Sequence, residues 1–324
     1  MKTKFFMGAA AVAAMAFVLA GGCDKGKSSS AQNTKTLKLA FVTNNASDFW
    51  KIAAAGVHKY EKEAGVQVDL KMPPNGTAEE QTQIIENLVS QGYDGIAVSV
   101  KAPKDEVAAL NRAAKKTNLI THDSDAPDSA RLCYIGTNNF EAGKVLGGEI
   151  VKLLPDGGKM AVFVGTLSAD NARQRLDGIK SVIAGKKIEI VAEKEDETDR
   201  AKARSNVENV INAYSDIKLL CGLWSYNGPA IAAAVEASGK KGQIKVAVFD
   251  EEDGTLDGIE KGVVNVTCVQ KPFQFGYQSA KMLHELATKG KSVVPAGGVV
   301  DTGVEIINAA NVKDFRAKLA EMKK

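Results

Sequence analysis

The sequence predicts an α/β protein made of two doubly wound lobes with parallel sheets. Short β-rich runs alternate with longer amphipathic segments, and this alternation occurs in two successive series along the 324-residue chain. Strands of four to seven residues that alternate with helices are typical of βαβ units, whose strands run parallel. A single hydrophobic core rarely grows beyond roughly 250–300 residues. A chain of this length with two such series therefore predicts two lobes.

The expected elements follow one another in a regular order. In the first series, the strand at 37–43 is followed by a helix at 50–64, the strand at 67–72 by a helix at 79–91, and the strand at 95–100 by a helix at 104–116. Two further strands follow at 119–122 and 132–135. The second series has strands at 160–164, 188–192, 219–224 and 246–249. They are followed in turn by helices at 169–183, 200–213, 229–237 and 255–261. A strand at 263–270, a helix at 274–289, a strand near 298–307 and a helix from about 312 could complete either lobe.

The first 22 residues have the composition of a secretory signal peptide. A basic start precedes an apolar run at 5–19 and three small residues, and this run is too short for a mature membrane span. The Leu-Ala-Gly-Gly-Cys ending resembles the lipobox of bacterial lipoproteins, although Leu19 stands one place further from the cysteine than usual. We expect a signal peptide at 1–22 and lipidation of Cys23, which would anchor the protein on the periplasmic side of a membrane. The alternative is a cleaved signal followed by an incidental cysteine.

The segment that follows is polar and lacks periodicity, so 23–36 is expected to be a lipidated tether. Net charge is only +3, from 42 basic and 39 acidic residues dispersed along the chain, which does not favour nucleic-acid binding. Three further cysteines, Cys133, Cys221 and Cys268, lie in apolar strand-like runs without Cys-x-x-Cys spacing. We expect them to be small buried side chains rather than disulfides or zinc ligands.

Motifs for catalysis, metals and cofactors are missing. The three histidines, His58, His122 and His284, do not form a His-x-x-x-His pair, and neither a nucleophile elbow nor a glycine-rich phosphate loop occurs. The acidic runs at 123–125 and 250–253 lack the glutamate that a calcium loop needs at its twelfth position. The sequence thus predicts no cofactor and no metal.

Polar side chains gather where the expected strands end. In open parallel sheets, ligands bind beyond the carboxyl ends of the strands. The residues at these positions are Asn44, Asn45, Asp48, Phe49 and Trp50, then His122 to Asp125, Gly165 and Thr166 with Arg173, Ser225 to Asn227, Asp250 to Asp253, and Gln270. Carboxylates, carboxamides and a guanidinium can satisfy the hydroxyls of a sugar, while aromatic rings cover its C–H face. We therefore expect a neutral polyhydroxylated ligand.

Several of these segments resemble the periplasmic sugar-binding proteins of the ribose-binding type, and the likeness covers nearly the whole chain after the tether. The segments are 39–43 (Leu-Ala-Phe-Val-Thr) with Phe49 and Trp50, 120–123 (Ile-Thr-His-Asp), 135–139 (Ile-Gly-Thr-Asn-Asn) with Gly143, 172–178 (Ala-Arg-Gln-Arg-Leu-Asp-Gly), Tyr226 and Asn227, 248–250 (Val-Phe-Asp), and 269–272 (Val-Gln-Lys-Pro).

This resemblance implies a type I periplasmic binding protein fold, in which three crossings near 136–138, 270–272 and 300–302 form a hinge between the lobes. It implies an N-lobe of 37–136 plus 271–300 and a C-lobe of 137–270 plus 301–324. It further implies a monomeric receptor that captures a monosaccharide and presents it to the permease of an ABC importer, without enzymatic activity.

The resemblance also implies roles for particular residues. Phe49 and Trp50 would stack on the sugar ring beside Asn44 or Asn45, and Asp123 would be the N-lobe carboxylate. The C-lobe would supply the guanidinium of Arg173, the carboxamide of Asn227, the carboxylate of Asp250 and, beside the hinge, the amide of Gln270. The chain departs from the ribose pattern at Ser124, where an arginine is usual, and at Thr198, where an aromatic is usual. Trp224 or Tyr226 could supply the second aromatic face, or the ligand could lack a second aromatic face altogether. Ribose itself is not expected.

Each residue also has a structural interpretation. Phe49 and Trp50 occupy adjacent helix positions, so at least one should belong to the core. Asp123, Asp250 and Asn227 could be helix N-caps. Arg173 could lie on the surface, and Arg175 is interpreted as a surface residue or an inter-lobe ion-pair partner.

Two other functions remain open at this point. One is a sugar-sensing adaptor for a membrane receptor, which would use the same site but a different partner. The other is an extracytoplasmic enzyme that uses Asp123 and Asp250 as an acid/base pair on a carbohydrate.

Overall fold

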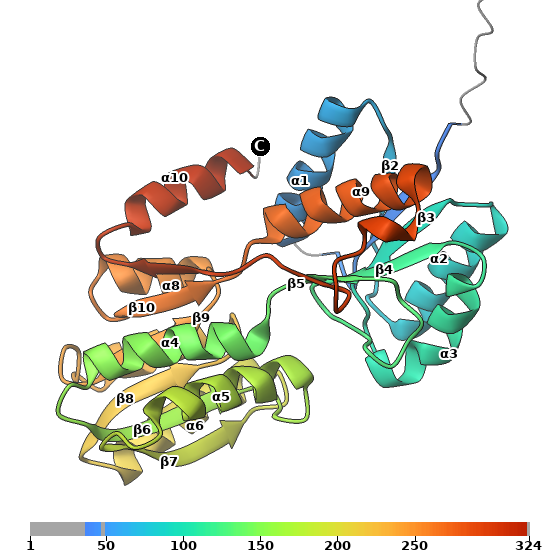
Figure 1. Cartoon of the computed structure of the whole chain (residues 1–324). Helices are drawn as coiled ribbons and strands as arrows, with labels where there is room; N and C mark the ends of the chain where they lie inside the picture. The colour runs from blue at the N-terminus through green and yellow to red at the C-terminus, as the bar shows by residue number, and fades with distance from the viewer. Residues whose placement is uncertain (1–35, 47–48, 323–324) are drawn as a thin grey trace, which may run out of the picture. The chain divides into compact units, whose positions relative to one another are not determined.

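The computed structural model describes residues 36–46 and 49–322 (Figure 1). The expected signal peptide, Cys23 and nearly all of the expected tether lie outside the described residues. Over the described part of the chain, no helix combines the length and the apolar character needed to cross a membrane.

The first sheet has six parallel strands in the order β11-β5-β4-β3-β1-β2. Its strands are β1 (Leu39–Val42), β2 (Val68–Lys71), β3 (Gly95–Val98), β4 (Asn118–His122), β5 (Tyr134–Gly136) and β11 (Val299–Asp301). Its helices are α1 (Phe49–Ala64), α2 (Ala78–Ser90), α3 (Pro103–Ala114) and α9 (Pro272–Lys289), and the 3₁₀ turn η1 (Lys291–Val293) follows α9.

Strand β1 shows why helices cover both faces of this sheet. Side chains alternate between the faces of a strand, and all four residues of β1 are buried. Leu39 and Phe41 pack with α1 and α9, while Ala40 and Val42 pack with α2 and α3. Helices α1 and α9 lie side by side, although they come from opposite ends of the described chain (Figure 1).

The second sheet repeats the arrangement, in the order β12-β10-β9-β8-β6-β7. Its strands are β6 (Gly158–Val164), β7 (Ile188–Glu195), β8 (Ile217–Gly222), β9 (Lys245–Phe249), β10 (Val266–Val269) and β12 (Glu305–Asn308). Helices α4 (Asn139–Leu153) and α5 (Asp170–Ile183) pack on one face. The other face carries α6 (Arg200–Ala213), α7 (Asn227–Ala237), α8 (Asp253–Glu260) and α10 (Val312–Met322). The prediction of two doubly wound lobes is confirmed.

The segment at 298–307 differs from the expectation of one strand. It forms two strands, β11 in the first sheet and β12 in the second, separated by a link that contains Gly303 at φ 67°. No helix reverses the direction of the chain between β11 and β12, so β12 runs antiparallel to its neighbour β10. All other pairs of named strands in the described residues are parallel.

The chain crosses between the sheets three times, after β5, after β10 and after β11. Hydrogen bonds join the first and third crossings: the amide of Thr302 donates to the Gly136 carbonyl at 2.9 Å, and the amide of Asn138 donates to Asp301 Oδ1 at 3.1 Å. The sheets establish which strands lie in each lobe, and the residues at which the lobes begin and end stay a prediction.

The three described cysteines, Cys133, Cys221 and Cys268, are free and completely buried. Their interpretation as small core side chains is confirmed.

Candidate functional site

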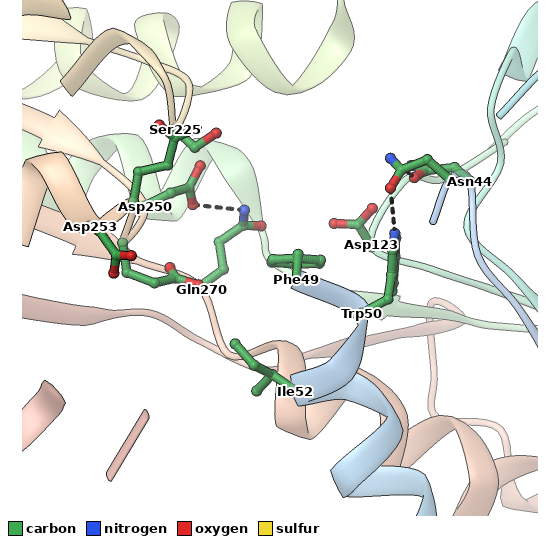
Figure 2. A pocket seen from close by; sticks show the side chains of 12 residues that line it. Asn44, Phe49, Trp50, Ile52, Asp123, Ser225, Asp250, Asp253 and Gln270 are labelled. Atoms are coloured by element: carbon green, nitrogen blue, oxygen red, sulfur yellow. Dashed lines mark hydrogen bonds between the residues drawn. The ribbon is translucent and has the colours of Figure 1, made fainter. Parts of the chain in front are cut away.

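A cavity of about 500 Å³ lies at the carboxyl ends of the strands of both sheets (Figure 2). The residues that line it are Asn44, Asn45, Phe49, Trp50, Ile52, Asp123, Ser225, Asp250, Glu251, Glu252, Asp253 and Gln270. From β1 the chain adds β2 on one side of the sheet and then β3, β4 and β5 on the other side. Such a switch point, here between β1 and β3, leaves a crevice in which ligands of doubly wound sheets bind. Asn44 and Asn45 follow β1 at this point.

Asp123 and Asp250 occupy equivalent positions in the two lobes. Each follows the fourth strand of its series, with φ of 56° and 68°, respectively. Each donates its amide hydrogen to a carbonyl of the next strand, at Ile135 (3.1 Å) and Cys268 (3.0 Å). The left-handed backbone costs a non-glycine residue on the order of 1 kcal/mol, although aspartate tolerates it better than most. Hydrogen bonds to the next strand therefore hold both carboxylates at the cavity in spite of an unfavourable backbone conformation.

Neither aspartate is a helix N-cap. A strand, β5, is the next regular element after Asp123. Helix α8 begins three residues after Asp250, with Glu252 at its N-cap position and no side-chain capping bond. The capping interpretation of both residues is wrong.

The carboxylate of Asp123 accepts a hydrogen bond from Ser99 Oγ at 2.9 Å. Burial raises the pKa of Asp123 to about 6. Ser99 and Arg175 oppose this increase, and the negative charge of Asp250 adds to it. The two carboxylates therefore repel each other across the cavity.

The carboxylate of Asp250 accepts a hydrogen bond from Gln270 Nε2 at 3.0 Å, drawn as a dashed line in Figure 2. A guanidinium nitrogen of Arg175 lies 3.7 Å from its second oxygen. Burial raises the pKa of Asp250 above its ordinary value, while Arg175 and Gln270 lower it.

Arg175 is buried, with 2% of its surface exposed, so its interpretation as a surface residue is wrong. Its Nε donates to Asn139 Oδ1 at 2.9 Å and one terminal nitrogen donates to the Leu223 carbonyl at 2.7 Å. Its guanidinium also lies 4.3 Å from the centre of the Phe249 ring. Because both Arg175 and Asp250 belong to the second lobe, the pair is not an inter-lobe ion pair either.

The pattern of α5 contains a signal for Arg175. Ala172 and Ile179 are completely buried, and Arg175 follows the first by three positions and precedes the second by four, which places it on the same face. Arg173 falls on the opposite face. Its side chain is 52% exposed, pairs with Asp170 at 2.6 Å and does not line the cavity.

Asn227 also lies away from the cavity. It is 1% exposed, its Nδ2 donates to Asp196 Oδ2 at 3.1 Å, and its Oδ1 accepts the amide of Trp224 at 3.0 Å. It is the first residue of α7 rather than its N-cap. The carboxamide therefore stabilises the loop before α7.

The two aromatics of α1 have different environments. Trp50 is 2% exposed and packs edge-to-face against Phe41 and His122, while its Nε1 donates to Asn45 Oδ1 at 3.2 Å. Phe49 is half-buried, and Figure 2 shows its ring between Gln270 and Asp123. The expectation that at least one of the pair belongs to the core is confirmed, and Phe49 offers the larger apolar face to the cavity.

The aromatic residues proposed for the second ring face do not line the cavity. The hydroxyl of Tyr226 donates to Asp196, and Trp224 Nε1 donates to Asn171 Oδ1 at 3.2 Å. Both side chains instead donate hydrogen bonds to other residues of the second lobe.

Sequence reasoning did not assign the lining residues Ile52, Ser225, Glu251, Glu252 and Asp253 to the site. The acidic run lies at the end of β9 and was visible as a strand-end cluster, but its side chains could not be oriented from sequence. All charged residues that line the cavity are acidic. The described residues contain no cluster that could hold a metal ion.

Comparison with known proteins gives a consistent result. Residues 39–292 match the family described as "Periplasmic binding protein domain". The xylose/arabinose-binding protein XylF of Sulfolobus acidocaldarius is 28% identical over 71% of this chain, which spans only 60% of that protein. An ABC transporter solute-binding protein from Burkholderia graminis, solved in complex with D-arabinose, is 32% identical with a TM-score of 0.78, over 86% of this chain and 98% of that chain.

A second similar structure is the XylFII–LytSN complex, with 26% identity and a TM-score of 0.72 over 85% of this chain and 98% of that chain. The resemblance inferred from the sequence is thereby confirmed.

Proposed function

Since this chain belongs to the periplasmic binding protein domain family, we propose that it captures a monosaccharide in the cavity between its sheets and delivers it to an ABC importer. The observation that carries this proposal is the equivalent placement of Asp123 and Asp250, one from each lobe, at one cavity. The relatives are binding proteins and not enzymes, as the sequence predicts.

The polar lining matches the chemistry of a sugar. Carboxylate oxygens of Asp123 and Asp250 accept hydrogen bonds from hydroxyls, and the amides of Asn44, Asn45 and Gln270 can both donate and accept. Phe49 covers a C–H face. We propose these residues, with Trp50 behind them, as the ligand-binding set. Arg175 does not line the cavity, and we propose that it acts through Asp250 instead of contacting the sugar.

Binding is coupled to closure because the ligand contacts both lobes. A ligand shifts an equilibrium between open and closed forms only through contacts that differ between them. Hydroxyls placed between Asp123 and Asp250 supply such contacts and also separate two charges that repel each other.

The family implies a location outside the cytoplasm. We further propose that Cys23 carries a lipid that holds the protein at the membrane. Labelling of cells with a radioactive fatty acid should mark the wild-type protein and not Cys23→Ser, and equal labelling of both would reject the anchor.

A thermal-shift screen of the purified protein against pentoses, hexoses, polyols and a hexuronate tests the proposed ligand class. A ligand present at 100 times its Kd stabilises the native state by about 2.7 kcal/mol, which raises the melting temperature measurably. Because all the charged lining residues are acidic, a neutral sugar should raise it and the matching hexuronate should not. A larger shift with the hexuronate, or no shift with any sugar, would contradict the proposal.

A sensing role has one observation in its favour, the similarity to a protein solved as a complex with LytSN. Deletion of the gene separates the two functions. Loss of uptake of the identified sugar supports transport, whereas normal uptake with loss of the transcriptional response to that sugar supports sensing.

A further inference from the structure

A chain of hydrogen bonds passes through the first crossing between the lobes. It begins at Tyr134, the first residue of β5, which is 7% exposed. Its hydroxyl lies 2.9 Å from the main-chain carbonyl of Asp123 and 3.3 Å from that of Thr137. A hydroxyl carries one hydrogen, so it donates to either carbonyl or is shared between them. Tyr134 thus connects the backbone of a site carboxylate to the backbone of the crossing.

The second half of this hydrogen-bond chain begins at the Thr137 carbonyl. Asn139, the first residue of α4, donates from Nδ2 to the Thr137 carbonyl at 3.3 Å and accepts from Arg175 Nε at 2.9 Å. Arg175 in turn lies 3.7 Å from the carboxylate of Asp250. The Thr137 carbonyl is therefore the common acceptor of two donors, one that contacts the Asp123 backbone and one that holds the partner of Asp250.

The position of this acceptor matters because Thr137 lies within the crossing. The direction of a backbone carbonyl is set by the dihedral angles around it, and a hinge motion is absorbed as changes in a few such angles. Rotation that redirects the Thr137 carbonyl therefore changes the geometry of its bonds to Tyr134 and Asn139. Neither Tyr134 nor Asn139 lines the cavity.

We propose that Tyr134 and Asn139 are positioning residues that couple the two site aspartates to the angle of the first crossing, and so set the equilibrium between open and closed forms. This inference depends on the proposed function, because it concerns the response of the same cavity to its ligand. A residue that acts on this equilibrium changes the affinity for every ligand by one common factor, since it contacts none of them.

Isothermal titration of the purified full-length protein with two structurally different sugars identified in the screen tests the proposal. Tyr134→Phe removes only the hydroxyl. Asn139→Asp keeps the acceptor for Arg175 and removes the donor to Thr137, and it also adds a negative charge beside the guanidinium. Each should change the Kd of both sugars by the same factor, roughly 2- to 10-fold for one hydrogen bond. Tyr93→Phe is the matched control, because it removes a tyrosine hydroxyl that donates to Asp69 in the same lobe.

Hydrogen exchange of the sugar-free protein gives a second readout that requires no ligand. The amides of Asn138 and Thr302, which are bonded across the crossings, should exchange faster in Tyr134→Phe than in the control. An unchanged Kd, or factors that differ between the two sugars by more than threefold, would overturn the inference, as would unchanged exchange. Failure of the wild-type protein to bind any sugar would instead reject the proposed function and leave the exchange experiment to decide the coupling.

Discussion

At the scale of single residues, the buried carboxylate of Asp123 makes stability depend on pH. The pKa of Asp123 is raised to about 6 by burial, so between its ordinary value and pH 6 the folded state binds more protons than the unfolded state. The contribution of Asp123 to the free energy of unfolding is therefore fully present in acid and is lost as pH rises through that window. The loss amounts to about 3 kcal/mol at most.

Asp123→Asn should remove this contribution to the pH dependence. Urea unfolding at pH 4 and pH 7 measures it: the wild type should lose more stability between the two values than the variant does. Asp128→Asn, an exposed aspartate in the same loop, should behave like the wild type. Equal pH dependence in all three proteins would contradict the assignment.

The two arginines of α5 provide a second prediction at this scale. Arg175→Lys keeps a positive charge but loses the planar set of donors to Asn139 and Leu223. It should weaken sugar binding at least tenfold, because the partner of Asp250 moves. Arg173→Ala should leave the affinity within twofold, since its side chain is exposed. Isothermal titration distinguishes them, and the opposite result would restore Arg173 to the site.

Strand ends predicted most of the residues that line the cavity, because the carboxyl ends of parallel strands gather at one edge. This reasoning found Asp123, Asp250 and Gln270. It selected Arg173 over Arg175 because a motif gives residue types, while the buried face of the helix decides which of two arginines points inward. It also included Asn227, whose side-chain partner Asp196 is 31 positions away in the sequence and could not be inferred from local pattern.

At the scale of elements, close packing between α4 and α5 holds Arg175 in place. A Cβ atom added to Gly143 would lie 2.1 Å from the main-chain oxygen of Arg175, and one added to Gly178 would lie 2.1 Å from that of Phe140. The helices can approach this closely only because glycine occupies both contacts. The backbone that carries the guanidinium is thus set by the contact with α4.

Gly143→Ala should therefore separate the two helices, with a destabilisation of about 1–3 kcal/mol and a loss of sugar affinity. Gly148→Ala is the matched control on the same helix, since a Cβ there meets nothing within 4 Å. Its better helix propensity should leave stability equal or up to about 1 kcal/mol higher. Chemical unfolding and titration of both variants test this, and a neutral Gly143→Ala would refute the packing argument.

The periodicity of the sequence predicted most of these elements, since alternation of β-rich and amphipathic runs is a local property. It failed at 298–307, which was expected to be one strand. The break between β11 and β12 arises because each pairs with a different sheet, and pairing of this kind is non-local. The assignment of α9 to the first lobe likewise depends on packing, here of Ala280 and Leu283 against the first sheet.

At the scale of the whole molecule, the cavity lies between two lobes, each with apolar clusters on both faces of its sheet. A bound sugar that engages Asp123 and Asp250 should draw the lobes together. Small-angle scattering should show a smaller radius of gyration with the identified sugar than without it. Asp250→Asn should abolish the difference at the same sugar concentration. An unchanged radius in the saturated wild type would exclude closure as the response.

The number of passages between the lobes has a practical consequence. Because three is odd, the described chain starts in one lobe and finishes in the other: β1 belongs to the first sheet, and α10 packs with the core of the second through Val312 and Leu319. Fluorophores attached near Leu37 and near Met322 would consequently move with different lobes. Energy transfer between such a pair reports ligand occupancy directly, without any label inside the cavity.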